Sequence, residues 1–207
     1  QFDGYAYRLV PIKTTYTDLW NAGRIDTDLL YHNLMEVYRY GNVADPRVYV
    51  DTFVNYNFNA TNIRIAFARL GAELARRGEK EKAVEVLDYG LEQMPVSQFQ
   101  YTYQYLPYIR AYYEAGATEK GDALFDSYAK NLEEYVDYFL SFPDNRQYLI
   151  ENQFADKLTA LAELHRIAEN YGRTDRAARI LNLFDWLFGP EGQTDYTEYE
   201  QTVLPTE

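Results

Sequence analysis

The sequence predicts an all-α protein: an array of paired helices joined by short polar turns, with an extended N-terminal arm. Two observations support this prediction. Apolar residues recur three and four residues apart in several long segments, which is the spacing of one face of an α-helix. The same short pattern occurs at Gly78, Gly116 and Gly172: the glycine is followed by a few polar residues and then by a small residue, where a new apolar stripe begins. We interpret each glycine as the end of one helix and the start of a turn into its partner.

Composition limits the classes of function. The 207 residues are 47% hydrophobic and 25% charged, as in folded globular proteins, and 22 of them are tyrosines, whose rings suit both cores and recognition surfaces. The formal net charge of −12 argues against nucleic acid as the main partner, because phosphate binding needs a basic surface. No apolar run approaches the roughly 20 residues that cross a bilayer, so we expect any membrane connection outside this chain. The lack of cysteine excludes disulfides and thiolate metal sites.

Residues 1–25 show no sustained period, and we expect an extended arm laid along the body. The expected anchors of the arm are its large apolar side chains: Tyr5, Tyr7, Leu9, Ile12 and Trp20. A helix is predicted from Asp26, whose carboxylate can cap the first amides, to Gly41. Pro46 interrupts the chain before a second segment at 47–56, which we interpret as a short helix on a weaker pattern.

The strongest helical pair lies between residues 62 and 95. A helix with one apolar stripe is followed by a polar turn and by a second amphipathic helix that stops at a proline. Residues 64–97 resemble a tetratricopeptide repeat, a 34-residue helix–turn–helix unit. The positions that carry this resemblance are Phe67, Leu70, Gly71, Leu74, Gly78, Ala83, Leu87 and Pro95. Gly90 stands where the repeat has a second alanine. The resemblance implies a right-handed α-α superhelix.

Two further pairs are predicted around Gly116 and Gly172. The first of these glycines lies 38 residues after its predecessor, but the second lies 56 residues further on, 22 more than one repeat of 34. We place the extra length within 129–160, as two helices that extend into a long hairpin with the sequence SFPDN at its tip. Pro107 is expected to kink a helix that starts near Phe99, with a place in the first turn as the alternative.

The chain as a whole is similar to one bacterial family. The stretches that carry the similarity are YAYRLVPIK, GRIDTDLLYHNLMEVYRYGN, AFARLGAELARRGEKEKAVEVLD and LPYIRAYYEAGATEK, spread over roughly residues 5–170. They resemble the C-terminal soluble part of multi-spanning membrane proteins of the domain of unknown function 2723 family, which is related to protein O-mannosyltransferases. The resemblance implies an accessory domain on the periplasmic face of the inner membrane. It also implies that the catalytic region of such a glycosyltransferase-like parent lies in membrane segments outside this chain.

Residue patterns with catalytic chemistry are few. The two histidines, His32 and His165, lack paired ligand spacing, and we expect both to be structural side chains rather than metal ligands. Asp26, Asp28 and Glu36 could supply a carboxylate pair, but acids at a helix start serve capping and the helix dipole. The sequence has no glycine-rich phosphate loop and no nucleophile elbow. We therefore expect no metal, no other cofactor and no catalysis by this chain.

A binding groove is predicted instead, along the first helices of the pairs. In such arrays these helices line the concave side, and the residues between the apolar stripe positions point into it. The site residues predicted in this way are Tyr103, Leu106, Arg110, Tyr113, Arg166 and Glu169. The first pair adds smaller side chains to the same groove: Ile65, Ala68, Ala72 and Ala75. Arginine can pair with a carboxylate through two hydrogen bonds, and tyrosine can stack on a sugar or a peptide. A solvated face without a ligand is the alternative.

Three regions are expected: the arm at 1–25, a helical repeat domain at 26–188, and an acidic tail at 189–207 that could fold back toward Arg110 or Arg166. The predicted function is a non-catalytic interaction module for a protein or peptide. Its partner would be an acceptor polypeptide, another subunit or the parent's own membrane region. A free-standing helical carbohydrate-active enzyme and a purely structural spacer are the alternatives. A buried pair of acidic residues in a deep pocket would favour the enzyme alternative. A blocked groove would favour the structural spacer.

Overall fold

The computed structural model describes residues 1–4, 6–9, 11, 23–51, 53 and 61–189. These residues are predominantly helical, and strand pairing among them is limited to two isolated bridges, from Phe2 to Tyr7 and from Phe2 to Ile25. The all-α prediction is therefore confirmed. Within the described part of the chain, no helix is both long enough and apolar enough to cross a membrane. The acidic tail beyond residue 189 lies outside the described residues.

The helical pairs predicted from the three glycines are present. The helices that form them are α2 (Thr61–Arg76), α3 (Lys80–Gln93), α4 (Tyr105–Glu114), α5 (Thr118–Leu140), α6 (Glu151–Asn170) and α7 (Thr174–Phe188). Gly78 lies between α2 and α3, Gly116 between α4 and α5, and Gly172 between α6 and α7. Their φ angles are +86°, +79° and +66°, in the left-handed region that glycine adopts without steric cost.

The three turns close with the same two hydrogen bonds. In the first turn, the amide of Gly78 donates to the carbonyl of Ala75 and the amide of Glu79 donates to the carbonyl of Leu74, both at 2.9 Å. The amides of residues 116 and 117, and of 172 and 173, make the equivalent bonds at distances between 2.7 and 3.1 Å. These bonds satisfy the last carbonyls of each first helix. The glycine pattern thus located these three turns correctly.

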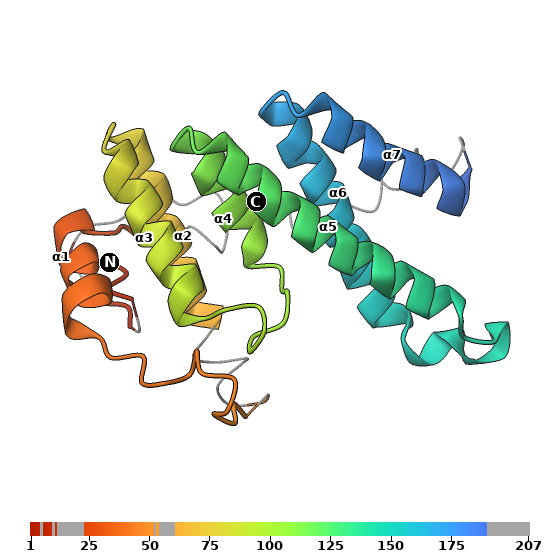
Figure 1. The fold of residues 1–207 in the computed structure, drawn as a ribbon, viewed down its shortest axis with the longest axis horizontal. Helices are drawn as coiled ribbons and strands as arrows, with labels where there is room; N and C mark the ends of the chain where they lie inside the picture. Colours follow the sequence, from red (N-terminus) through yellow and green to blue (C-terminus); the bar gives the residue numbers. More distant parts are fainter. Residues whose placement is uncertain (5, 10, 12–22, 52, 54–60, 190–207) are drawn as a thin grey trace. The chain divides into compact units, whose positions relative to one another are not determined.

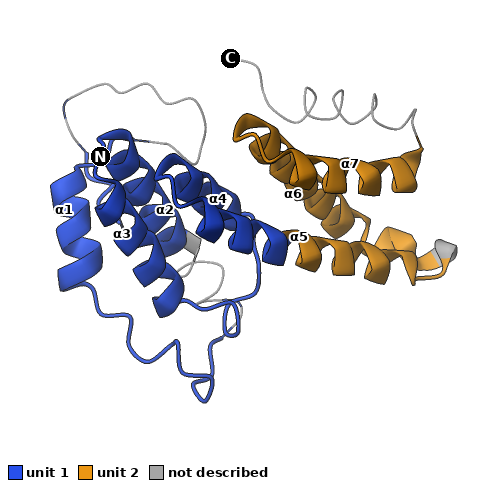
Figure 2. Ribbon diagram, turned by 45° about the horizontal axis from the view of Figure 1, so that its top comes forward, with its two compact units in different colours: residues 1–128 blue, residues 129–207 orange. Residues whose placement is uncertain are grey.

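The chain divides into two compact units, residues 1–128 and residues 129–207, shown in different colours in Figure 2. The boundary falls inside α5, so the residues that the sequence analysis grouped as one helical domain at 26–188 belong to both units.

Unit 1 is built around α2. This helix packs against both α3 and α4, and Figure 1 shows the three helices side by side. The apolar stripe predicted on α2 is its buried face: Ile63, Phe67, Leu70 and Leu74. Small residues allow the close approach between helices, because a Cβ on Gly71 would lie 2.7 Å from Leu87 and one on Gly121 would lie 2.6 Å from the ring of Tyr113. The predicted role of a small residue in the second helix is confirmed at Gly121.

The helix that begins at Asp26 is shorter than predicted. Asp26 caps α1 (Thr27–His32), with its carboxylate accepting from the amide of Leu29 at 3.1 Å, as expected. A π-helical turn follows at Asn33–Val37, and the backbone becomes extended at Tyr38 rather than closing at Gly41. The hydroxyl of Tyr38 donates to the carbonyl of Asp3 at 2.9 Å, so a contact with the N-terminal segment accompanies the extended backbone that follows the helix before Gly41. In the predicted helix at 47–56, residues 47–51 are non-helical, Phe53 has a π-helical conformation, and 52 and 54–60 lie outside the described residues.

The N-terminal arm is held by a different side chain from those predicted. Phe2 is only 4% exposed and belongs to the core of unit 1, whereas Leu9 is 98% exposed and Tyr7 is also exposed. The backbone adds to this anchor, because the amide of Phe2 donates to the carbonyl of Arg24 at 2.7 Å. Tyr5, Ile12 and Trp20 lie outside the described residues.

Pro107 does not kink a helix. α4 begins at Tyr105, so Pro107 occupies its first turn, which was the alternative interpretation. Proline is tolerated there because the first amides of a helix have no intrahelical acceptor. Tyr101 therefore precedes the helix and stacks on Tyr128, with the two ring centroids 5.4 Å apart.

Unit 2 contains the long hairpin that the repeat spacing predicted. The last part of α5 and the start of α6 are joined through a 3₁₀ turn at Asp144–Leu149. The rings of Phe139 and Phe154 stack with centroids 3.7 Å apart, and Tyr135 donates to Gln153 at 2.8 Å. α7 packs against α6 and is tied to α5 by an ion pair between Arg179 and Glu133 at 2.7 Å. The extra residues between the second and third turns therefore form additional helical length.

Candidate functional site

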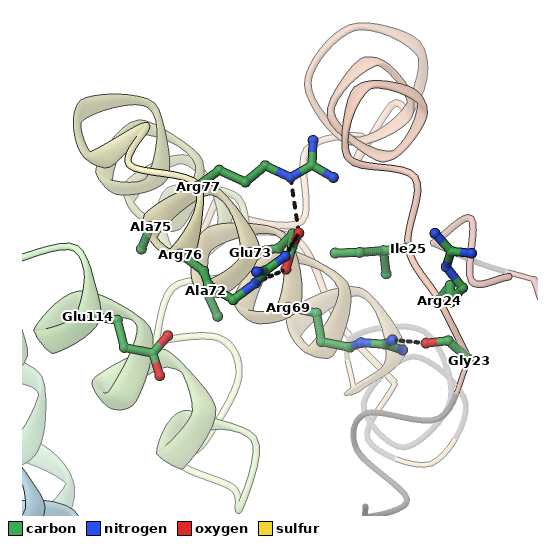
Figure 3. A pocket seen from close by; sticks show the side chains of 10 residues that line it. All are labelled: Gly23, Arg24, Ile25, Arg69, Ala72, Glu73, Ala75, Arg76, Arg77 and Glu114. Carbon is green, nitrogen blue, oxygen red and sulfur yellow. Dashed lines mark hydrogen bonds and ion pairs between the residues drawn. The ribbon is translucent and has the colours of Figure 1, made fainter. Parts of the chain in front are cut away.

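Unit 1 contains an open pocket of about 670 Å³ between α2, the segment 23–25 and the end of α4 (Figure 3). Its lining among the described residues is Gly23, Arg24, Ile25, Arg69, Ala72, Glu73, Ala75, Arg76, Arg77 and Glu114. We call these residues the arginine pocket. The lining contains four arginines and two glutamates, so the pocket carries a net positive charge although the formal net charge of the chain is −12.

Helix α2 supplies one wall of the arginine pocket. Arg69, Ala72, Glu73 and Arg76 are spaced three, one and three residues apart, and therefore share one face of the helix. This face is adjacent to the apolar stripe that packs into the core. The burial of that stripe consequently fixes the direction in which the arginines project.

The opposite wall is the segment 23–25, which Arg69 holds in place. Its Nη2 donates to the carbonyl of Gly23 at 2.6 Å, and its guanidinium lies over the ring of Phe2, 4.9 Å from the centroid. A cation over an aromatic face is favourable, particularly where it is shielded from water, as at this largely buried arginine. The same Phe2 that anchors the N-terminal arm thus also supports one side of the pocket.

Glu73 organises two of the other arginines. It accepts from Arg76 Nε at 2.8 Å and Nη2 at 2.6 Å, and from Arg77 Nε at 3.0 Å. The Glu73 side chain is 20% exposed, whereas that of Arg76 is 72% exposed. Hydrogen bonds from the two guanidiniums hold the pKa of Glu73 below its ordinary value, despite partial burial, which acts in the opposite direction.

Glu73 is expected to titrate below the ordinary glutamate pKa of about 4.3, and the double variant Arg76→Gln/Arg77→Gln is expected to return its pKa upward. Because the folded pKa is depressed, the stabilisation from this cluster is complete above the ordinary pKa and is lost as pH falls through the folded one. Its size is expected to be below about 1 kcal/mol, since the arginines are largely solvated. NMR titration of the Glu73 side chain measures both values, and an identical pKa in the double variant would contradict this account.

The six predicted site residues are divided between the two units. Tyr103, Leu106, Arg110 and Tyr113 belong to unit 1, and the other two belong to unit 2. Leu106 is 1% exposed and Tyr113 is 8% exposed, and the hydroxyl of Tyr113 donates to Asp122 at 2.9 Å. These two side chains are therefore committed to helix packing, while Tyr103 and Arg110 are half-buried.

Arg166 and Glu169 lie on α6 in unit 2, and both are exposed. Arg166 makes two hydrogen bonds to the buried Glu163, at 2.9 and 2.8 Å, so much of its donor capacity is already used within its own helix. Glu169 lies 3.7 Å from the Nδ1 of His165, also on α6.

The remaining predicted groove residues fall partly on the arginine pocket. Ala72 and Ala75 line it, whereas Ala68 is buried in the core. The charged residues of the pocket were missed, although the sequence ELARR places an acid three and four residues before two arginines, a spacing that predicts ion pairs on one helix face. Arg24 carried no comparable signal, because only the tertiary fold brings it to α2.

The histidines make local contacts. The Nδ1 of His32 lies 2.6 Å from the carboxylate of Glu36, one turn along the chain, and both side chains are exposed. Within the part of the chain that the structure describes, no group of three or more histidine, aspartate or glutamate side chains is placed to hold a metal ion.

Comparison of the chain with protein-family models, with curated proteins and with solved structures gives no match in any of the three.

Proposed function

We propose that this chain is a non-catalytic interaction module that binds a segment of polypeptide in the arginine pocket of unit 1. The observation that supports this most directly is the pocket itself, about 670 Å³ in volume and open to solvent, lined by side chains with hydrogen-bond donors and by small apolar ones. Ala72, Ala75 and Ile25 leave room for a main chain to approach, and the arginines offer oriented donors around them. Such a site suits recognition of an extended chain.

We propose further that the helical pairs form a tetratricopeptide-like array with a right-handed superhelix. The packing of α2 against its own partner α3 and against α4, the first helix of the next pair, supports this proposal. On the family resemblance, the module would be the soluble C-terminal domain of a glycosyltransferase-like membrane protein, at the periplasmic face of the inner membrane. Its polypeptide ligand would then be an acceptor chain, another subunit or part of the parent itself.

A selection of random displayed peptides on the immobilised chain tests the proposal. We expect recovered peptides to bind with dissociation constants in the micromolar range, as is usual for short segments on preformed sites, roughly −7 to −8 kcal/mol. The variant Ala72→Trp, which fills the pocket with a large side chain without changing charge, is expected to weaken their binding at least about tenfold.

The matched control is Ala123→Trp, which places the same side chain at an exposed position on α5 outside the arginine pocket. It is expected to bind the recovered peptides as the wild type does. If the selection recovers no peptide that binds, the proposal of an interaction module is wrong. Equal binding by Ala72→Trp and the wild type would show that the arginine pocket is not the site.

A further inference from the structure

We infer that the ligand of the arginine pocket is an acidic peptide segment, whose carboxylates pair with Arg24, Arg76 and Arg77. This inference rests on the proposed function and specifies the chemistry of its partner. Four of the ten lining residues are arginines, in a chain with 32 acidic and 20 basic residues. An acidic segment is thus attracted to this pocket and repelled by the acidic excess of the chain as a whole.

The hydrogen-bond geometry leaves donors for such a ligand. Arg76 uses Nε and Nη2 for Glu73, so its Nη1 is not engaged by that carboxylate. Arg77 gives only Nε to Glu73, which leaves both of its Nη groups. The Arg24 guanidinium is exposed and makes no hydrogen bond or ion pair within the described part of the chain; only the backbone carbonyl of Arg24 is engaged, by the amide of Phe2. A guanidinium edge with two parallel N–H groups matches the two oxygens of a carboxylate.

Glu73 prepares the site rather than occupying it. It accepts from the inner edges of Arg76 and Arg77 and thereby fixes the directions in which their remaining N–H groups point. A ligand therefore meets guanidiniums that have already lost part of their rotamer freedom, which reduces the entropic cost of binding. Arg69 has a different role, because its Nη2 is directed to Gly23 and its guanidinium covers Phe2.

The arrangement favours several separate carboxylates over a single phosphate. A phosphate site needs donors that converge on one point, but the Glu73 carboxylate lies between Arg76 and Arg77 and would repel a compact dianion there. Arg24 projects from the opposite wall of the pocket, on the far side of Ile25. Cationic groups on two walls with the apolar Ile25 between them match acidic side chains spaced along an extended peptide.

The test uses fluorescence anisotropy with a labelled peptide in which every second residue is glutamate, and a matched peptide with glutamine at the same positions. The wild-type chain is expected to bind the glutamate peptide at least about tenfold more tightly than the glutamine peptide. This preference is expected to weaken as salt rises from about 0.05 to 0.5 M, since exposed charges are screened. The variant Arg24→Glu/Arg77→Glu is expected to abolish it.

The control variant Lys130→Glu/Arg146→Glu makes the same change in net charge on two exposed residues outside the arginine pocket. It is expected to retain the preference within about twofold, because only local charge should matter at such ionic strength. Circular dichroism shows whether each variant is folded. The inference would be overturned if Arg24→Glu/Arg77→Glu still preferred the glutamate peptide over the glutamine peptide. It would also be overturned if inorganic phosphate bound to the pocket more tightly than the glutamate peptide does.

The outcomes separate this inference from the proposed function. Suppose that Ala72→Trp weakens the binding of the selected peptides, but that the glutamate and glutamine peptides bind the wild type equally well. The chain would then still be an interaction module, but its ligand would not be an acidic peptide. If the peptide selection recovers nothing and the glutamate peptide also fails to bind, both proposals fail.

Discussion

Replacing Arg64 with alanine is expected to lower the free energy of unfolding of unit 1 by about 3 kcal/mol or more. Arg64 is 2% exposed, and its guanidinium donates to the carbonyls of Met94 at 3.3 Å, Phe99 at 3.1 Å and Gln100 at 3.4 Å. These carbonyls belong to the connection between α3 and α4. The variant would leave them without this donor and would open a cavity beside α2.

Two aromatic rings add to the role of this arginine. Its guanidinium carbon lies 4.7 Å from the centroid of Tyr105 and 5.4 Å from that of Phe99. A buried cation is costly without partners, so the carbonyls and ring faces together offset the desolvation of Arg64. The variant Arg64→Met, which fills most of the volume but donates nothing, is expected to be intermediate in stability.

Urea denaturation followed by far-ultraviolet circular dichroism measures this effect. Arg76→Ala is the matched control, because it removes a largely exposed arginine from the same helix and is expected to cost far less than Arg64→Ala. If Arg64→Ala cost no more than Arg76→Ala, the buried arginine would not be what holds the 94–100 connection to α2.

Gly90→Ala is expected to destabilise unit 1 by about 2 kcal/mol, although alanine favours a helix by up to about 1 kcal/mol over glycine. A Cβ at residue 90 would lie 2.7 Å from the ring of Phe67 and would also meet the hydroxyl of Tyr108. Both neighbours are fully buried side chains of the core. Overpacking of a closed core at this scale costs about 1–3 kcal/mol and exceeds the gain in helix propensity.

The double variant Gly90→Ala/Tyr108→Phe tests the cause. The hydroxyl of Tyr108 is buried and has no hydrogen-bond partner among the described residues, so its removal deletes one clash and one unsatisfied group. We expect Tyr108→Phe to cost no stability by itself and to recover part of the loss caused by Gly90→Ala. Calorimetric unfolding of the four proteins measures the coupling, and strictly additive effects would show that the hydroxyl is not the obstacle.

The local signals predicted the helical pairs well. The turn glycines at 78, 116 and 172 could be found because a left-handed residue and a change of apolar stripe are both written in a few consecutive residues. The long hairpin was predicted from the same spacing. By contrast, the end of the first helix and the start of α4 depend on what the chain meets there. Tyr38, at the end of the first helix, donates to the carbonyl of Asp3, and Tyr101, just before α4, stacks on Tyr128.

The candidate site was predicted only in part, for a related reason. Helical periodicity predicts which residues share a face, but a shift of one residue turns a side chain by about 100°. The predicted face of α4 contained Leu106 and Tyr113, which packing buries, whereas Glu114, one residue further, lines the arginine pocket. Arg24 joins the pocket because Phe2 holds the N-terminal segment against α2, a contact between residues far apart in sequence.

The sequence by itself determined that the described part of the chain is helical, where the turns at Gly78, Gly116 and Gly172 lie, and that the net charge is acidic, because each of these follows from composition or from neighbours within a few residues. The tertiary structure decided where the first helix ends and α4 begins, how the N-terminal segment is anchored, and where arginines gather into one pocket. These features depend on contacts between distant segments, whose energies come from packing and desolvation and leave no periodic mark in the sequence.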